Sequence, residues 1–172
     1  MANPVRQFDY TPAWGGITPT DGQDVIEFWL AEKALGQRPL VEQRLKQLVC
    51  LARDRADGSV AGVCTAVLQT PSLMAQPFYV YRSFVGRRWR DSRLVYNLFM
   101  QARKILEDYA IANDYPAIGI LAELESPAFT RAGKLAVWPK VDLVYVGKSP
   151  RGLDVRVCYF RRAQLKRQQP QI

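Results

Sequence analysis

The clearest pattern in the sequence lies in residues 90–109, RDSRLVYNLFMQARKILEDY. Apolar side chains recur there at intervals of three and four residues, the period of an α-helix with one buried face. That face consists of Val95, Leu98, Phe99, Ala102, Ile105, Leu106 and Tyr109. The opposite face is polar, and Asn113-Asp-Tyr-Pro follows as a stop signal. The pattern predicts one long amphipathic helix that packs on a sheet.

The segments around this helix are typical of strands, with shorter helices near the start of the chain. Residues 48–53 and 60–68 flank Asp57-Gly58, a dipeptide that favours a hairpin turn, and both are apolar on both faces, as central strands are. A first helix is expected after Ile17, with Thr20 or Asp21 as its cap. We also predict a helix at 39–47, strands at 78–85, 117–124, 141–147 and 153–160, and a short helix at 127–135.

The composition is that of one globular domain. The chain has 172 residues, of which 48% are hydrophobic and 23% charged, enough to bury a core without disulfides or metal. It contains no histidine, which excludes Ser-His-Asp and Cys-His catalysis and histidine-ligated zinc. Cys50, Cys64 and Cys158 form no CxxC pair, which favours a reduced, cytoplasmic protein. Cys64 and Cys158 lie in strand patterns and are expected to be small core residues.

Neither a membrane span nor a targeting segment is predicted. Residues 58–81 carry no charge, but Pro71 and Pro77 interrupt them, so they are expected to form strands and a loop. The first residues lack the apolar core of a signal peptide. We expect a domain at 17–160, an extended N-terminal arm at 1–16 and a basic C-terminal tail at 161–172.

The chain is basic, with 24 lysines and arginines against 16 acidic residues. This balance favours anionic partners without choosing among them. Five arginines lie where Asp91 is the only nearby acid: Arg82, Arg87, Arg88, Arg90 and Arg93. They are either a solvated surface, a phosphate site at the start of the long helix, or a nucleic-acid surface that includes an exposed Trp89 and the cations of the tail.

The order of the predicted elements over residues 17–160 resembles the GNAT fold of the GCN5-related N-acetyltransferases. Arg90-Asp-Ser-Arg93-Leu-Val95 lies where that family has Gln/Arg-x-x-Gly-x-Gly/Ala. Arg93 and Val95 occupy the two small-residue positions, so either the turn is wider and the Arg93 side chain contacts phosphate, or the cofactor site has been lost. The resemblance implies an α+β fold, with a mixed, mostly antiparallel sheet of six or seven strands flanked by helices.

The resemblance also implies a function, transfer of an acyl group from acetyl-CoA or another acyl-CoA to the amine of a small molecule or peptide. Pyrophosphate would bind at the helix start and pantetheine along strand 78–85. The implied cofactor contacts are Val80, Phe84, Val85, Arg90, Asp91, Ser92, Arg93, Leu94 and Val95. No metal is implied, because a backbone N–H can polarise the acyl carbonyl. A homodimer built from the C-terminal strands would fit the same resemblance.

Candidate acid–base residues follow from the absence of histidine. Glu123 and Glu125, at the end of strand 117–124, are candidates to deprotonate the amine. Ser126 or a strand tyrosine would protonate the thiolate, because segment 127–135 lacks the tyrosine that the family places there. The tyrosine candidates are Tyr81, Tyr79 and Tyr145.

Each of these assignments has an alternative. One glutamate would instead cap the helix that begins at Pro127, and the tyrosines would be core residues. Trp138 would end a loop and line the acceptor cleft. The alternative for the whole chain is a catalytically inactive GNAT-like domain that binds nucleic acid or a protein partner through its basic face.

Overall fold

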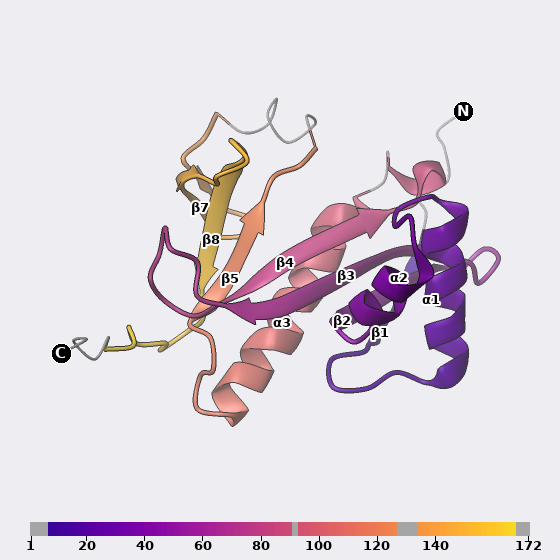
Figure 1. Cartoon of the computed structure of the whole chain (residues 1–172), viewed down its shortest axis with the longest axis horizontal. Coiled ribbons are helices and arrows are strands. Elements are labelled where there is room, and N and C mark those ends of the chain that lie inside the picture. The colour runs from indigo at the N-terminus through magenta and orange to yellow at the C-terminus, as the bar shows by residue number, and fades with distance from the viewer. Residues whose placement is uncertain (1–6, 91–92, 127–133, 168–172) are drawn as a thin grey trace. The chain divides into compact units, whose positions relative to one another are not determined.

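The computed structural model describes residues 7–90, 93–126 and 134–167 (Figure 1). The described strands form one eight-stranded sheet in the order β1-β2-β3-β4-β5-β8-β7-β6. The predicted α+β class and mostly antiparallel sheet are confirmed, but the sheet has eight strands rather than six or seven. The chain divides into two compact units. The first unit contains Met1–Ala66 and Arg82–Leu106, and the second unit contains Val67–Tyr81 and Glu107–Ile172.

The predicted helices and strands other than the helix at 127–135 are confirmed to within a few residues, and two short strands, at 8–12 and 137–138, were not predicted. The described helices are α1 (Pro19–Ala31), α2 (Arg38–Leu45) and α3 (Leu94–Ala112), with a 3-10 turn η1 (Arg87–Trp89). The strands are β1 (Phe8–Pro12), β2 (Leu48–Asp54), β3 (Val60–Gln69), β4 (Phe78–Val85), β5 (Gly119–Glu123), β6 (Val137–Trp138), β7 (Leu143–Lys148) and β8 (Asp154–Tyr159).

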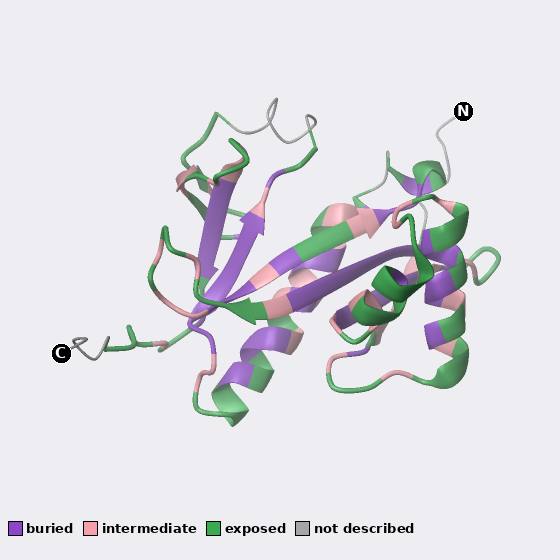
Figure 2. Ribbon diagram, viewed as in Figure 1, coloured by how far each residue is buried: buried purple, intermediate pink, exposed green. Residues whose placement is uncertain are grey.

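The first unit contains the predicted hairpin of β2 and β3. Its turn includes Gly58 at φ 73°, a left-handed conformation that glycine adopts without strain. Residues 60–66 of β3 are all buried, as expected for a central strand (Figure 2). β1 pairs antiparallel with β2, so residues 8–12 belong to the sheet rather than to a separate extended arm. The segment has only five residues and ends at a proline, so its sequence is a weak signal for a strand.

Thr18 caps α1, in place of the predicted Thr20 or Asp21. The Thr18 hydroxyl accepts a 3.1 Å hydrogen bond from the Asp21 backbone N–H, and Pro19 occupies the first helical position, where it needs no hydrogen-bond partner. The helix buries Trp29, which is 2% exposed, so the predicted core role of this side chain is confirmed.

One stripe of α3 is completely buried. The stripe consists of Leu94, Leu98, Ala102, Leu106 and Ala110, each 0% exposed and four residues apart. At its N-terminal end the helix packs closely over Gly62 of β3. A Cβ atom at Gly62 would lie 3.0 Å from the Leu98 side chain and 3.2 Å from the Phe84 carbonyl oxygen. A side chain at position 62 would therefore push α3 and β4 away from β3.

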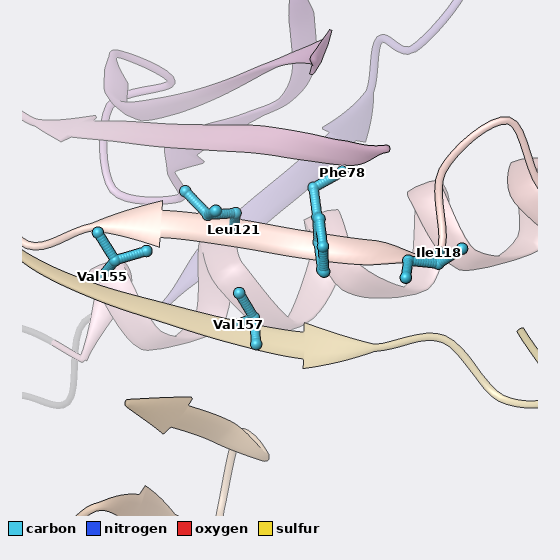
Figure 3. Packing of buried hydrophobic residues seen from close by; sticks show 5 residues of the cluster. All are labelled: Phe78, Ile118, Leu121, Val155 and Val157. Carbon is cyan, nitrogen blue, oxygen red and sulfur yellow. The ribbon is translucent and has the colours of Figure 1, made fainter. Parts of the chain in front are cut away.

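The second unit combines one parallel strand pair with antiparallel pairs. Residues 79–81 of β4 lie opposite residues 120–122 of β5 in parallel register. β5 pairs antiparallel with β8, β8 with β7, and β7 with β6. Buried apolar side chains from β4, β8 and the β5 region form the core of this unit (Figure 3): Phe78, Ile118, Leu121, Val155 and Val157.

The C-terminal third differs most from the predictions. β6 was expected to be loop, and its two residues have no periodicity that could reveal a strand. Of the predicted helix at 127–135, residues 127–133 lie outside the described residues, and Lys134 and Leu135 lie in a turn and a bend. Residues 161–167 belong to the segment predicted as a basic tail, and hydrogen bonds join them to Gln76, Glu107 and Tyr115 of the same unit.

Two further observations concern the chain as a whole. The three cysteines are buried and form no disulfide, and the predicted core positions of Cys64 and Cys158 are confirmed. Among the described helices, not one combines the length and the apolar character that crossing a membrane requires.

Candidate active site

The turn between β4 and α3 carries the predicted cofactor residues and lies in the first unit. After β4 ends at Val85, the Gly86 backbone N–H donates a 2.9 Å hydrogen bond to the Ala61 carbonyl oxygen. A Cβ atom on Gly86 would lie 2.8 Å from the Trp89 ring, so the turn can close only around glycine. The turn is therefore fixed to β3 before the chain reaches α3.

Trp89 is buried in this turn, so the prediction of an exposed ligand contact is wrong. Its side chain is 6% exposed, and the indole Nε1–H donates a 2.7 Å hydrogen bond to an Asp54 carboxylate oxygen. Asp54 is itself 3% exposed and also accepts the Ala56 backbone N–H at 3.0 Å. These two donors hold the pKa of Asp54 below its usual value. The buried hydrogen bond between Trp89 and Asp54 thus holds the turn against the end of β2.

Two of the five arginines are neutralised by acids from other segments, and not only by Asp91 as expected. Arg87 lies 3.3 Å from Glu32, and Arg88 lies 2.7 Å from Asp57 in the hairpin turn. Within the described residues, the other three form no ion pair with a carboxylate: Arg82, Arg90 and Arg93. Three of the five arginines, rather than all five, therefore carry a charge that no carboxylate of the described residues offsets.

The predicted phosphate contacts at the start of α3 differ in their exposure to solvent. Arg90 and Arg93 are exposed, and the Arg90 guanidinium lies 6.0 Å from the Phe84 ring centroid. Leu94 is completely buried, so its side chain cannot contact a phosphate, whereas Val95 is half-buried. Asp91 and Ser92 lie outside the described residues.

The β4 residues predicted to contact pantetheine are largely core residues. Val80 is half-buried against the hydrophobic cluster of the second unit, and Val85 is 6% exposed. Phe84 is half-buried and makes an edge contact with Phe28, with ring centroids 5.7 Å apart. The backbone of β4 is more informative, because its parallel register with β5 ends at Tyr81 while β4 continues to Val85.

The two candidate bases lie together in the second unit, and Arg151 holds them there. The Arg151 guanidinium lies 2.8 Å from Glu125 and 3.4 Å from Glu123. Glu123 is the less exposed of the two, with 24% of its side chain accessible against 53% for Glu125. Ser126 follows immediately and is exposed. Whether a glutamate caps a helix at Pro127 concerns residues outside the described ranges.

Arg151 is a functional candidate that the sequence analysis missed. It lies in the turn between β7 and β8, and the sequence had predicted only a connection between two strands there. The antiparallel register places Glu123 opposite Val155, and this brings the end of β5 to the turn that carries Arg151. Pairing of distant strands creates the contact, so no local pattern could have indicated it.

The candidate tyrosines are mostly core residues. Tyr81 is 6% exposed and Tyr79 is 2% exposed, and burial raises the pKa of Tyr79 to about 12. Tyr145 is 40% exposed and lies on β7. No group of three cysteine or acidic side chains among the described residues is placed to hold a metal ion.

Arg156 is a second residue that the sequence analysis missed. It is 1% exposed on β8, and its guanidinium lies 4.1 Å from the Trp138 ring centroid. It donates hydrogen bonds to the carbonyl oxygens of Leu135, at 2.9 Å, and Ala136, at 3.3 Å. Burial lowers the pKa of Arg156. Trp138 was predicted to end a loop, and instead it is a strand residue held by this arginine.

Comparison with known proteins identifies the fold. No family model matches the sequence, and no curated protein matches it either. Among solved structures, a GNAT-family acetyltransferase from Streptococcus pneumoniae matches with a TM-score of 0.59 and 12% identity, over 90% of this chain and 99% of that one. A GCN5-related N-acetyltransferase from Kribbella flavida matches with a TM-score of 0.57 and 18% identity, over 89% and 98%.

A third solved structure is that of AtaTR bound with AcCoA. It matches with a TM-score of 0.58 and 15% identity, over 88% of this chain and 93% of that one. At these identities the likeness is one of fold, and the match extends over nearly the whole of each chain. The protein therefore has the GNAT fold.

Proposed function

We propose that the protein is an acyl-CoA-dependent N-acyltransferase, which most simply transfers acetyl from acetyl-CoA to the amine of a small molecule or peptide. The observation that carries this proposal is the GNAT fold, shared with solved acetyltransferases and with a protein bound to AcCoA. In the reaction the amine nitrogen attacks the thioester carbon, an N–C bond forms and the C–S bond breaks. The amine loses a proton and the thiolate gains one.

The start of α3 supports the binding of the CoA pyrophosphate. The first-turn N–H groups of a helix lack partners within the helix, and the helix dipole favours an anion there. Arg90 and Arg93 are exposed beside these groups. In this proposal the Arg93 side chain itself contacts phosphate, in place of the close backbone approach that glycine allows in the family.

The end of β4 supports the placement of the pantetheine arm. The pairing of β4 with β5 ends at Tyr81, whereas β4 itself continues to Val85. We assign the amide groups of pantetheine to this part of the β4 backbone, where they would hydrogen-bond as a neighbouring strand does. A backbone N–H of the same strand would polarise the acyl carbonyl.

Glu123 is the better of the two candidate proton acceptors. It lies at the end of β5 and is less exposed than Glu125, while Arg151 fixes the position of both carboxylates. A fixed, partly buried carboxylate can take a proton from the attacking ammonium directly or through water. Glu125 then serves to hold Arg151. Ser126 and Tyr81 stay candidates for the protonation of the leaving thiolate.

The first prediction concerns ligand binding, which thermal unfolding measures directly. Acetyl-CoA at about 100 times its Kd should add about 2.7 kcal/mol of stability and raise Tm by about 5–11 °C. Free CoA should act similarly, because the pyrophosphate site is common to both. The absence of any shift at millimolar acetyl-CoA would contradict the proposal and favour a non-catalytic domain.

Variants at the start of α3 sharpen this test. Arg90→Ala with Arg93→Ala should weaken CoA binding by about tenfold or more, because each arginine provides charge-assisted hydrogen bonds to phosphate. The matched control is Arg38→Ala with Arg55→Ala, which removes the same charge from arginines that already face Glu42 and Asp9. An equal loss of affinity in both double variants would show that net charge alone attracts CoA.

A second prediction separates the roles of the two glutamates. Glu123→Gln should lower kcat by about 100-fold, the usual contribution of a positioned base, while the shift in Tm with acetyl-CoA persists. Glu125→Gln should change kcat by less than about threefold. Release of CoA thiol, measured with the best acceptor from a panel of small amines and peptides, gives the rates. A larger fall in kcat for Glu125→Gln than for Glu123→Gln would identify Glu125 as the base.

A further inference from the structure

The C-terminal basic segment, residues 161–167, follows a defined path on the second unit. The Tyr115 hydroxyl donates a 2.7 Å hydrogen bond to the Arg161 carbonyl oxygen, and the Arg161 backbone N–H donates a 2.7 Å hydrogen bond to the buried Glu107. The Gln76 side chain clamps Lys166 twice. Its amide oxygen accepts the Lys166 N–H at 2.7 Å, and its amide nitrogen donates to the Lys166 carbonyl at 3.0 Å.

This path gathers positive charge around one hollow. Arg162, Lys166 and Arg167 line a hollow of about 350 Å³, together with Tyr115 and Leu165. Asp114 is the single acidic residue among the described residues that line it. The Lys166 ammonium lies 3.4 Å from the backbone carbonyl of Asp114 rather than on a carboxylate. The hollow therefore carries a net positive charge.

Several arginines elsewhere in the described residues face a carboxylate, as Arg55 does at 2.6 Å from Asp9 and Arg151 does at 2.8 Å from Glu125. Within the described ranges, none of the three cations that line the hollow forms such an ion pair. Holding like charges side by side costs free energy, and an anionic ligand would remove that cost.

We infer that this hollow binds the phosphodiester backbone of a single-stranded nucleic acid. Three side-chain cations spread along an exposed segment suit successive phosphates, and Tyr115 offers an aromatic ring beside them. A single free phosphate is usually held by backbone N–H groups at a helix start or turn, and here the segment's charges come from flexible side chains. The inference is independent of acyl transfer, since it uses none of the residues assigned to that reaction.

Fluorescence anisotropy of a labelled, mixed-sequence 15-nucleotide RNA tests the inference, at 50 and 200 mM KCl. Arg162→Gln with Arg167→Gln should weaken binding by about tenfold at the lower salt concentration. It should also reduce the slope of log K against log salt by about 1.4, that is about 0.7 for each lost phosphate contact. The matched control, Arg38→Gln with Arg55→Gln, removes the same charge and should change Kd by less than about twofold.

Two more variants identify the surface that binds. Gln76→Ala leaves every cation in place but removes the clamp on Lys166, so it should weaken binding through lost preorganisation. Arg90→Ala with Arg93→Ala should not change the RNA affinity by more than the matched control does. The Tm of each variant, measured without RNA, verifies that it folds.

Several outcomes would overturn the inference. Equal losses in the Arg162/Arg167 variant and the matched control would show attraction by net charge only. A loss of RNA affinity confined to the Arg90/Arg93 variant would show that the RNA binds at the start of α3. Displacement of RNA by millimolar inorganic phosphate at constant ionic strength would identify a free-phosphate site. Failure of the wild type to bind RNA at 50 mM KCl would show that the hollow does not bind single-stranded nucleic acid.

Discussion

Gly119→Ala should lower the free energy of unfolding by about 3 kcal/mol and Tm by about 6–12 °C. Gly119 begins β5, where a Cβ atom would overlap the carbonyl oxygen of Cys158 on β8 and lie 3.1 Å from the Phe78 ring. The backbone of β8 cannot move aside without breaking its pairing with β5. Chemical and thermal unfolding of the purified variant measure the loss.

Gly36→Ala is the matched control for that variant. A Cβ atom at Gly36 meets nothing within 4 Å, and the residue does not have a positive φ. Its Tm should stay unchanged or rise slightly, because alanine reduces the conformational entropy of the unfolded chain. If Gly119→Ala is as stable as Gly36→Ala, the close approach of β5 and β8 at this point is incorrect.

Trp89→Phe should cost about 2 kcal/mol at pH 7. The substitution keeps an aromatic ring in the turn but removes the N–H that Asp54 accepts at 2.7 Å. Asp54 would stay buried with the Ala56 N–H at 3.0 Å and the Arg88 guanidinium at 3.9 Å. Because the turn leads to the start of α3, CoA binding should weaken in the same variant. Urea unfolding and the acetyl-CoA shift measure the two effects separately.

The pH dependence of Trp89→Phe has a defined sign. The Trp89 and Ala56 N–H groups lower the pKa of folded Asp54, so its contribution to stability is present above the ordinary Asp pKa of 3.8 and is lost as pH falls through the lowered value. Without Trp89 that folded pKa returns toward 3.8, so less stability is lost on the acid side. The difference in Tm between wild type and variant should therefore shrink from pH 7 to pH 3. A constant difference would show that Asp54 does not depend on Trp89.

The fold could be predicted where short-range spacing alone determines structure. Leu98, Ala102 and Leu106 of the predicted face of α3 are completely buried, whereas Tyr109 at its end is 40% exposed. β2 and β3 are apolar on both faces around an Asp-Gly turn, as predicted. β1 and β6 could not be predicted in this way. β1 has five residues and β6 has two, and each is a strand because it pairs with a longer neighbour.

The candidate site could be predicted only in part, because its side chains depend on distant partners. Trp89 stands among arginines in the sequence, which suggested exposure, but the carboxylate that buries it comes from residue 54. Glu123 and Glu125 were located correctly at the end of a strand, whereas Arg151, which joins them, comes from a turn 26 residues beyond Glu125. The spacing of residues along the chain does not encode such contacts.

The segments of the two units alternate along the sequence. The boundaries after Ala66, Tyr81 and Leu106 fall inside β3, β4 and α3, so the polypeptide crosses from one unit to the other in the middle of regular elements. A cut at any of these crossings would break a strand or a helix instead of a linker. Neither unit can therefore be excised as one continuous segment, and limited proteolysis should not release a stable fragment of one unit.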